Sequence, residues 1–427
     1  MSSPKLLDKF VGLQYPILMV AVFLFAYLFG QTASRFVSIL TWCWFVYSIY
    51  VLQKYTINKS LKSWMTVLIF YILLTLLGYT YNGVPMMGFY VEFKAFLCPM
   101  LLVFVGAVNV DKKVYYWYLL AVAFCMIVGL YIYAFQPSWY VAFKTSVLSE
   151  LWYADENLTE ANLMIKYSRF SSFFPNIYPV SYSGTFAYCI LINDLYKERK
   201  QRLIENRTLQ ISLMLLIIVG VLYTMVRVAF IYIILVTIIY YFYGIKSKNA
   251  NNSAVLIIFL FFICVLSILV IQLESTNNNI DIERLLGRLG ALSYDDMMNG
   301  SRTEQNISAL TAWQNYLTGD GFGSRGGYAR GLGLPGITDG GWTKMLVELG
   351  IVGTLLFLMF IFSTYRRACK SFRYYLVELS ILSYGLIAMI GADTFSKGWI
   401  ATIMWIAVGR IWNINYLNNK IITKDYV

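Results

Sequence analysis

The chain has 427 residues, of which 59% are hydrophobic and only 13% are charged. This composition excludes an ordinary soluble protein, in which about a quarter of the residues are charged. The chain contains no histidine, which excludes histidine-based acid–base chemistry and histidine metal sites. The formal net charge of +12 does not indicate nucleic acid, because the basic residues gather in short stretches between apolar segments.

Apolar runs of nearly the ~20 residues needed to cross a bilayer recur along the chain. They predict an all-α polytopic membrane protein with about twelve transmembrane helices, at residues 15–30, 35–52, 64–81, 93–108, 114–135, 177–196, 209–225, 226–243, 254–272, 342–365, 375–390 and 399–413. Residues 1–272 would hold the first nine spans and a smaller external loop at 136–176. Residues 273–341 would form a large external loop domain, and residues 342–427 the last three spans with a cytoplasmic C-terminus.

The basic clusters follow the second, fourth, sixth, eighth and tenth predicted spans. Lysine and arginine are enriched in cytoplasmic loops of membrane proteins. We therefore expect a multi-pass membrane protein with both termini in the cytoplasm, and loops 136–176 and 273–341 on the external side. The six cysteines form no CxxC pair, so neither a disulfide framework nor a zinc site is expected.

Residues 209–243 form an apolar-dominated run whose only charge is Arg227. A single helix of that length would exceed about 50 Å, which is too long for a hydrocarbon core of ~30 Å. We therefore predict two short helices with a turn near residues 224–227. This turn puts Arg227 at the external membrane boundary.

The large external loop contains two predicted helices and a glycine-rich stretch. Residues 281–291 form the first helix and carry Arg288, while residues 303–317 form the second, with Ala309, Leu310, Trp313 and Leu317 on one face. Many glycines follow at residues 319–341, where they permit tight turns and close backbone approach to a ligand.

Arginines around this loop predict a site for phosphate groups, because the guanidinium group offers forked donors. They are Arg302, Arg325 and Arg330, and the nearby carboxylates are Asp320, Asp339 and Glu348. Several of these residues could also have a purely structural role and no role in binding phosphate. Arg302 in a loop is often simply solvated, and Glu348 has the helical spacing to pair with Lys344.

The order of these features resembles the O-antigen polymerase and O-antigen ligase superfamily, whose polymerase members are called Wzy. The resemblance spans residues 167–358 and rests on five motifs. They are Arg169 followed by Phe174-Pro175-Asn176; Thr224-Met225-Val226-Arg227; Ser301-Arg302 opening a helix with Trp313; Gly319-Asp320-Gly321-Phe322-Gly323; and Glu348-Leu349-Gly350-Ile351-Val352-Gly353.

The resemblance implies a membrane-embedded glycosyltransferase with GT-C-like architecture, which inverts the anomeric centre and uses no metal or other cofactor. Its donor and acceptor would be glycans carried by undecaprenyl diphosphate at the outer leaflet of the inner membrane, among membrane lipids. A chain-length regulator protein is an expected partner. Ligases of this superfamily place a histidine before the span at 342–365, where this chain has Ile337-Thr338-Asp339. Its absence favours the polymerase over the ligase.

The chemistry of glycosyl transfer from a diphosphate predicts a role for each of these residues. Arg227 and Arg302 would stabilise the departing diphosphate, because guanidinium groups in a water-poor pocket stabilise developing negative charge. Further contacts to the diphosphate or glycan would come from Arg169, Arg325, Arg330 and Arg288. Asp339 is the first candidate for the general base, with Glu348 orienting it; water and the departing diphosphate remain alternatives.

Two functions from other classes also fit the composition. A polysaccharide transporter would explain the many spans, but it predicts charges near the bilayer midplane or repeated halves. A metal-dependent lipid-linked glycosyltransferase predicts acidic residues in the first external loop, and residues 31–34 contain none.

Overall fold

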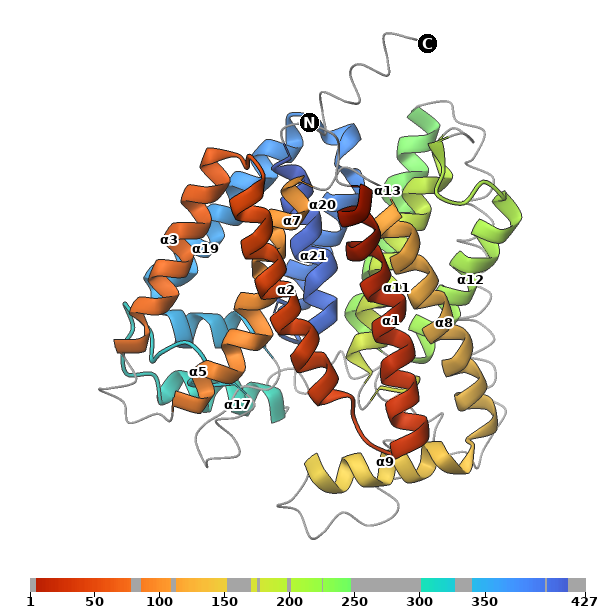
Figure 1. The fold of residues 1–427 in the computed structure, drawn as a ribbon, viewed down its shortest axis with the longest axis horizontal. Helices are drawn as coiled ribbons and strands as arrows, with labels where there is room; N and C mark the ends of the chain where they lie inside the picture. The colour runs from red at the N-terminus through yellow and green to blue at the C-terminus, as the bar shows by residue number, and fades with distance from the viewer. Residues whose placement is uncertain are drawn as a thin grey trace. The chain divides into compact units, whose positions relative to one another are not determined.

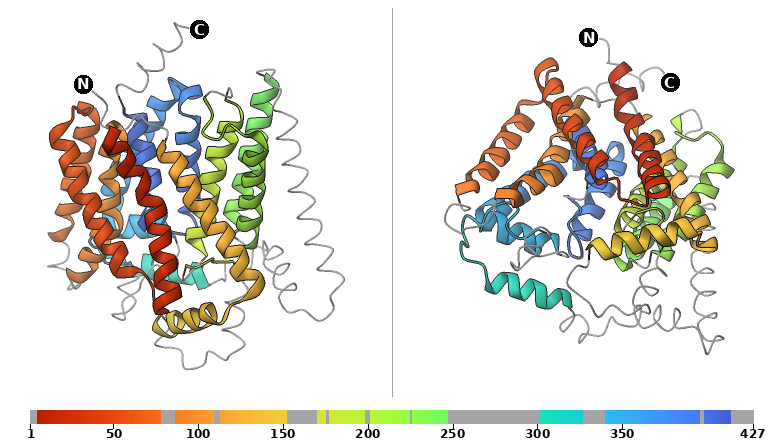
Figure 2. Two further views of the ribbon diagram at one scale, coloured as in Figure 1. Left: turned by 45° about the vertical axis from the view of Figure 1, so that its right-hand side comes forward. Right: turned by 60° about the horizontal axis from the view of Figure 1, so that its bottom comes forward.

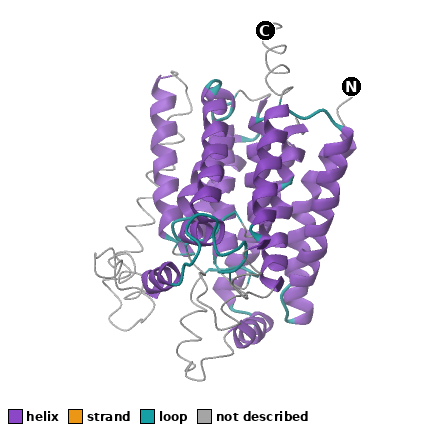
Figure 3. Cartoon of the chain, turned by 90° about the vertical axis from the view of Figure 1, so that its left-hand side faces the viewer, coloured by secondary structure: helices purple, strands orange, loops and turns teal. Residues whose placement is uncertain are grey.

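The computed structural model describes residues 5–77, 86–108, 113–151, 170–174, 177–197, 201–224, 226–246, 301–326, 340–395 and 398–413. Within these ranges the chain consists of helices and connecting loops, and it has no strand (Figure 3). The predicted all-α class is therefore confirmed. Every predicted span coincides with one or more helices, except residues 254–272, which lie outside the described residues.

Five helical segments among the described residues are long and apolar enough to cross a membrane. They are Phe10–Phe29, Phe36–Lys54, Met86–Val108, Lys113–Phe135 and Gly341–Cys369. Shorter apolar helices occupy Arg207–Tyr223, Arg227–Phe242, Leu376–Ala388 and Ile400–Ile411. The total number of spans stays a prediction.

Large apolar side chains on the outer face of helix α19 (Gly341–Cys369) also indicate a membrane protein. Leu355, Met359 and Phe362 are 53%, 55% and 70% exposed, and their spacing puts them on one stripe. A continuous exposed apolar stripe is unfavourable in water and favourable against lipid. The composition and the exposed stripe therefore agree on a membrane environment.

The chain divides into two compact units. Unit 1 comprises Met1–Phe36 and Asp111–Ser293, and unit 2 comprises Val37–Val110 and Tyr294–Val427. Each unit thus combines segments that are distant in the sequence, which Figure 1 shows as mixed colours within each group of helices. Helix α2 (Ser34–Lys54) begins just before the boundary, and most of it belongs to unit 2.

Unit 1 is built around α11 (Tyr178–Leu195), which is almost entirely buried. It packs against three other helices, α8 (Lys113–Phe135), α12 (Arg207–Tyr223) and α13 (Arg227–Lys246). Because α12 ends at Tyr223 and α13 begins at Arg227, the predicted turn near residues 224–227 is confirmed.

The first helix of unit 1, α1 (Lys5–Phe29), packs along α8. The short helix α9 (Ser138–Leu151) lies across the ends of α1 and α8 (Figures 1 and 2). Aromatic side chains hold α9 in place, because the Trp139 ring meets the rings of Phe23 and Tyr27 edge to face. This helix falls within the predicted external loop 136–176.

Unit 2 is built around α21 (Gly398–Ile411), which packs closely against α7 (Leu102–Val108). Their backbones nearly touch, since a Cβ added at Gly106 would lie 2.2 Å from the Ile406 carbonyl oxygen. Helix α20 (Leu376–Ala388) packs against α21, and α3 (Lys59–Leu74) packs against α19. The short 3-10 helix Phe372–Tyr374 connects α19 to α20.

The segment before α7 contains a π-helix. Helix α5 (Met86–Glu92) runs into the π-helix η1 (Phe93–Leu97) and then into the single turn α6 (Cys98–Met100). An inserted π-turn changes the direction in which side chains leave the helix, and such turns are frequent at functional sites. Glu92 is the residue at this transition.

One predicted helix is shorter than expected. Helix α17 covers Ser301–Thr311, whereas the sequence pattern predicted residues 303–317. Ala309 is buried, but Leu317 is 66% exposed, so the expected apolar face does not continue. The helix stops because polar groups of the following loop bind the backbone beyond Thr311, as described below.

Candidate functional site

The long helix α19 is interrupted at Gly350, which has φ 68° and ψ −177°. A left-handed φ with an extended ψ is essentially restricted to glycine. Gly350 therefore divides α19 into a short first part, which carries Lys344 and Glu348, and a longer second part.

The loop after α17 supplies hydrogen bonds to the interruption. The Asp320 amide donates to the Val347 carbonyl at 2.8 Å, and the Gly321 amide donates to the Glu348 carbonyl at 3.2 Å. Beyond the break, the Ile351 amide donates to the Tyr316 carbonyl at 2.9 Å. A break in an apolar helix is tolerated where other protein groups satisfy the exposed backbone. The loop and α19 thus form one structural element.

Close backbone approach explains one glycine of this loop. Gly319 has φ 82°, and a Cβ added there would lie 2.2 Å from the carbonyl oxygen of Glu348. The Tyr71 hydroxyl of α3 donates to the Leu349 carbonyl at 2.8 Å. The carbonyl groups of Val347, Glu348 and Leu349 therefore all have partners outside the helix.

An ion pair between Arg325 and Asp320 organises the loop. The Arg325 Nη2 atom lies 2.6 Å from Asp320 Oδ2 and donates to the Ala312 carbonyl at 2.8 Å. Asp320 Oδ1 accepts hydrogen bonds from the amides of Gln314 and Asn315, each at 3.1 Å. These contacts bind the backbone just after Thr311 and end α17 there.

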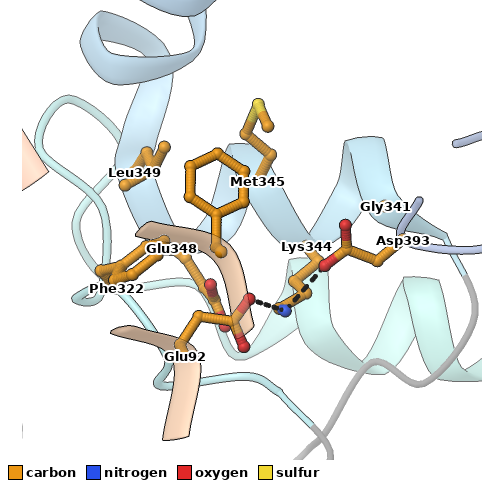
Figure 4. Close-up of a pocket in the computed structure, with 9 residues that line it drawn as sticks. Glu92, Phe322, Gly341, Lys344, Met345, Glu348, Leu349 and Asp393 are labelled. Carbon is orange, nitrogen blue, oxygen red and sulfur yellow. Dashed lines mark hydrogen bonds and ion pairs between the residues drawn. The ribbon is translucent and has the colours of Figure 1, made fainter. Parts of the chain in front are cut away.

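A second charged cluster lies at the first turn of α19 (Figure 4). The Lys344 Nζ atom is 2.6 Å from Glu92 Oε1 and 2.8 Å from Asp393 Oδ2. Glu92 ends α5, and Asp393 lies in the connection from α20 to α21. We call Glu92, Lys344 and Asp393 the triad. The alternative that Lys344 simply pairs with Glu348 is not the observed arrangement, because the ammonium donates to carboxylates from two other elements.

Glu348 lies beside the triad and is only 2% exposed. Its Oε1 atom accepts a hydrogen bond from the Arg325 amide at 3.0 Å. The charges of Lys344 and Glu92 both act on this carboxyl group. Glu348 and the triad line one pocket, and its remaining walls are Phe96, Phe322, Gly341, Met345 and Leu349. The pocket has room for about one water molecule.

The described residues bring together two of the predicted site residues, Glu348 and Arg325. Arg227 begins α13 in unit 1 and is half-buried. Arg302 lies on α17, but its side chain is not among the described ones. Four predicted residues lie outside the described residues altogether, and they are Arg169, Arg288, Arg330 and Asp339.

The sequence interpretation missed Glu92 and Asp393. Both lie at ends of predicted spans that face the same side as the glycine-rich loop, namely before residues 93–108 and after residues 375–390. A search for acidic residues at the external ends of spans would have found both. Their convergence on Lys344 depends on the packing of α5, α19 and α21.

Among the described residues, no group of three or more histidine, cysteine or acidic residues has an arrangement suited to a metal ion. Comparison of the sequence with protein-family models finds no match, and comparison with curated proteins finds none either. The resemblance to the polymerase and ligase superfamily therefore stays a prediction from the five sequence motifs.

Proposed function

We propose that this protein is a membrane-embedded glycosyltransferase that polymerises oligosaccharide repeat units of a surface polysaccharide, of O-antigen or capsule type. One observation carries the proposal. Glu348, a buried carboxyl group, faces a pocket the size of one hydroxyl group, on an interrupted apolar helix beside an arginine-containing loop. In a transferase that joins sugars on a lipid carrier, a group of this kind can serve as the general base for the acceptor hydroxyl.

In the proposed reaction, the acceptor hydroxyl attacks the anomeric carbon of a donor glycan on undecaprenyl diphosphate. The bond from this carbon to the diphosphate breaks, and the diphosphate leaves with the electron pair. Attack from the opposite face inverts the anomeric centre, and guanidinium groups stabilise the departing charge without a metal. Arg227 and Arg302 are the proposed groups, with Arg169, Arg288, Arg325 and Arg330 as further contacts.

Proton removal from the acceptor requires a base in a chain without histidine. A carboxylate supplies a rate factor of about 10²–10⁴ when it serves as general base. Asp339 and Glu348 are the proposed candidates. Glu348 already faces the pocket, and Asp339 directly precedes the Gly340–Gly341 start of α19 in the sequence.

The proposed location is the bacterial inner membrane, with the reaction on the periplasmic side and a chain-length regulator as partner. The ligase remains the closest alternative in chemistry, and the lack of histidine counts against it.

A polysaccharide transporter is a second candidate, favoured by the interruption of α19 beside buried ionisable residues. Broken helices and buried charges are also the features with which transporters bind substrates and ions. Flux of lipid-linked glycan across sealed vesicles would support the transporter.

Lipid-linked glycan profiling in a deletion strain tests the proposal. The proposed function requires accumulation of single repeat units, and wild-type protein should restore long chains even in the presence of a chelator. Full-length chains that stay unattached would indicate a ligase, and an unchanged profile would refute both. Complementation with Glu348→Gln should fail, whereas Glu378→Gln, which alters a buried ion pair away from the pocket, should retain polymerisation at matched protein levels.

A further inference from the structure

Three carboxyl groups and one ammonium group line the pocket. Among the described residues, Glu92, Glu348 and Asp393 supply the carboxyl groups, and Lys344 supplies the ammonium group. The neighbouring guanidinium of Arg325 is paired with Asp320. In apolar surroundings, ionised groups are stable only where an opposite charge compensates them. Because one ammonium group cannot compensate three carboxylates, the described part of the pocket favours protonation of at least one carboxyl group.

The contacts separate Glu348 from the other two carboxyl groups. Glu92 and Asp393 each lie within 2.8 Å of the Lys344 ammonium. For Glu348, the described residues provide a backbone amide of Arg325 but no lysine or arginine side chain at ion-pair distance. Ionisation is therefore more costly for Glu348 than for the two carboxylates bound to Lys344.

We infer that the triad is a positioning device that sets the protonation of Glu348, the group that exchanges the proton of the acceptor hydroxyl. The positive charge of Lys344 and the negative charge of Glu92 act on Glu348 in opposite directions, and Asp393 binds the Lys344 ammonium. The catalytic meaning of this inference rests on the proposed glycosyl transfer. The charge coupling itself is a property of the pocket and can be measured without substrate.

The exchanged proton has a defined path in the reaction. The acceptor O–H bond breaks as its oxygen bonds to the anomeric carbon, and the proton passes to an oxygen of the Glu348 carboxylate. The diphosphate departs with the electrons of the broken C–O bond. Glu348 then returns the proton to water or to the diphosphate before the next turnover. A pocket the size of one water molecule fits a single hydroxyl group at this carboxylate.

Infrared titration of the purified full chain in lipid nanodiscs tests the coupling. We expect a protonated-carboxyl band that disappears as the pH rises and that is absent in Glu348→Gln. In Lys344→Met, the midpoint should move up by about one pH unit or more, because Glu348 loses a neighbouring positive charge. In Glu92→Gln, it should move down, because a neighbouring negative charge is lost.

Glu378→Gln is the matched control, since Glu378 and Arg410 form another buried ion pair of unit 2, with a distance of 3.0 Å. It should lower stability without moving the midpoint. If Lys344→Met does not fold, Glu92→Gln still tests the inference, with a shift of opposite sign. An unmoved midpoint in the triad variants would overturn the inference, as would a band that survives in Glu348→Gln.

The pH dependence of polymerisation separates this inference from the proposed function. The probe is the single-repeat lipid-linked glycan extracted from the deletion strain. If the wild-type protein is active and the acid limb of the pH–rate profile lies at the same pH in Lys344→Met, the triad does not set the protonation of Glu348. Wild-type protein that shows the infrared shifts but does not polymerise the glycan would refute the proposed function and leave the coupling in place.

Discussion

The substitution Gly350→Ala should destabilise unit 2 strongly, because Gly350 is where α19 is interrupted. Its φ of 68° is unfavourable for alanine, and an added Cβ would lie 2.4 Å from both the Gly319 amide nitrogen and the Leu317 carbonyl oxygen. Both atoms belong to backbone, so the contact cannot be relieved by rotating a side chain. Either the loop must leave the interruption or α19 must change its conformation.

The magnitude follows from these two effects. The backbone conformation costs alanine about 1–3 kcal/mol. Displacing the loop also weakens hydrogen bonds such as those from Asp320 to Val347 and from Ile351 to Tyr316, at about 1 kcal/mol each. A combined loss of about 4 kcal/mol corresponds to a fall in Tm of roughly 8–16 °C for a unit of this size.

The assay is thermal unfolding of the full chain in nanodiscs, followed by tryptophan fluorescence. Gly391→Ala is the matched control, because a Cβ added at Gly391 meets no atom within 4 Å. That variant should unfold within about 2 °C of the wild type. Equal Tm values for the two variants would refute the idea that the loop and the interruption of α19 depend on each other.

Four further predictions address topology, the arginines, the base and pH. A cysteine introduced at Leu317, which is 66% exposed, should react with an impermeant thiol reagent in intact spheroplasts, whereas exposed native Cys369 should react only after lysis; the reverse order would contradict the proposed orientation. Arg227→Lys should abolish polymerisation nearly as fully as Arg227→Ala, because lysine lacks the two-donor fork; recovery of most activity with lysine would reduce Arg227 to a point charge. Asp339→Asn should lower turnover by about 10²–10⁴-fold if Asp339 is the base, and an active Asp339→Asn enzyme would leave that role to Glu348. Burial lowers the pKa of Lys144 on α9 to about 7, against 10.5 ordinarily. Between these two pH values the unfolded chain binds more protons than the folded chain, so stability should rise with pH. Lys144→Met should flatten this rise in Tm values measured across the pH range, and an unchanged slope would contradict the assignment.

The sequence alone determined the helical class and most element positions, because these depend on local composition. Runs of apolar residues of membrane-spanning length coincide with helices throughout the described residues. The turn between α12 and α13 was also predictable, since 35 consecutive residues with a single charge are too long for one span and their basic flanks require an even number of crossings. The importance of the stretch from Gly319 to Glu348 followed from its glycines and charges.

Tertiary structure alone decided which charges meet. The helical spacing of Lys344 and Glu348 allows a local pair, but Glu92 and Asp393 approach Lys344 from α5 and from the α20–α21 connection. Local spacing cannot reveal partners that lie 252 and 49 residues away along the chain. The end of α17 at Thr311 likewise depends on Asp320 and Arg325, whose side chains bind its following backbone only after the loop has folded.

The interruption of α19 is also decided by tertiary contacts and not by the local sequence. A glycine within an apolar run is compatible with a continuous helix, so Gly350 by itself predicts no break. The break is stable because the amides of Asp320 and Gly321 and the carbonyl of Tyr316 replace the lost helical partners. Those groups come from another part of unit 2, and only the folded chain brings them to Gly350 and exposes Glu348 to the pocket.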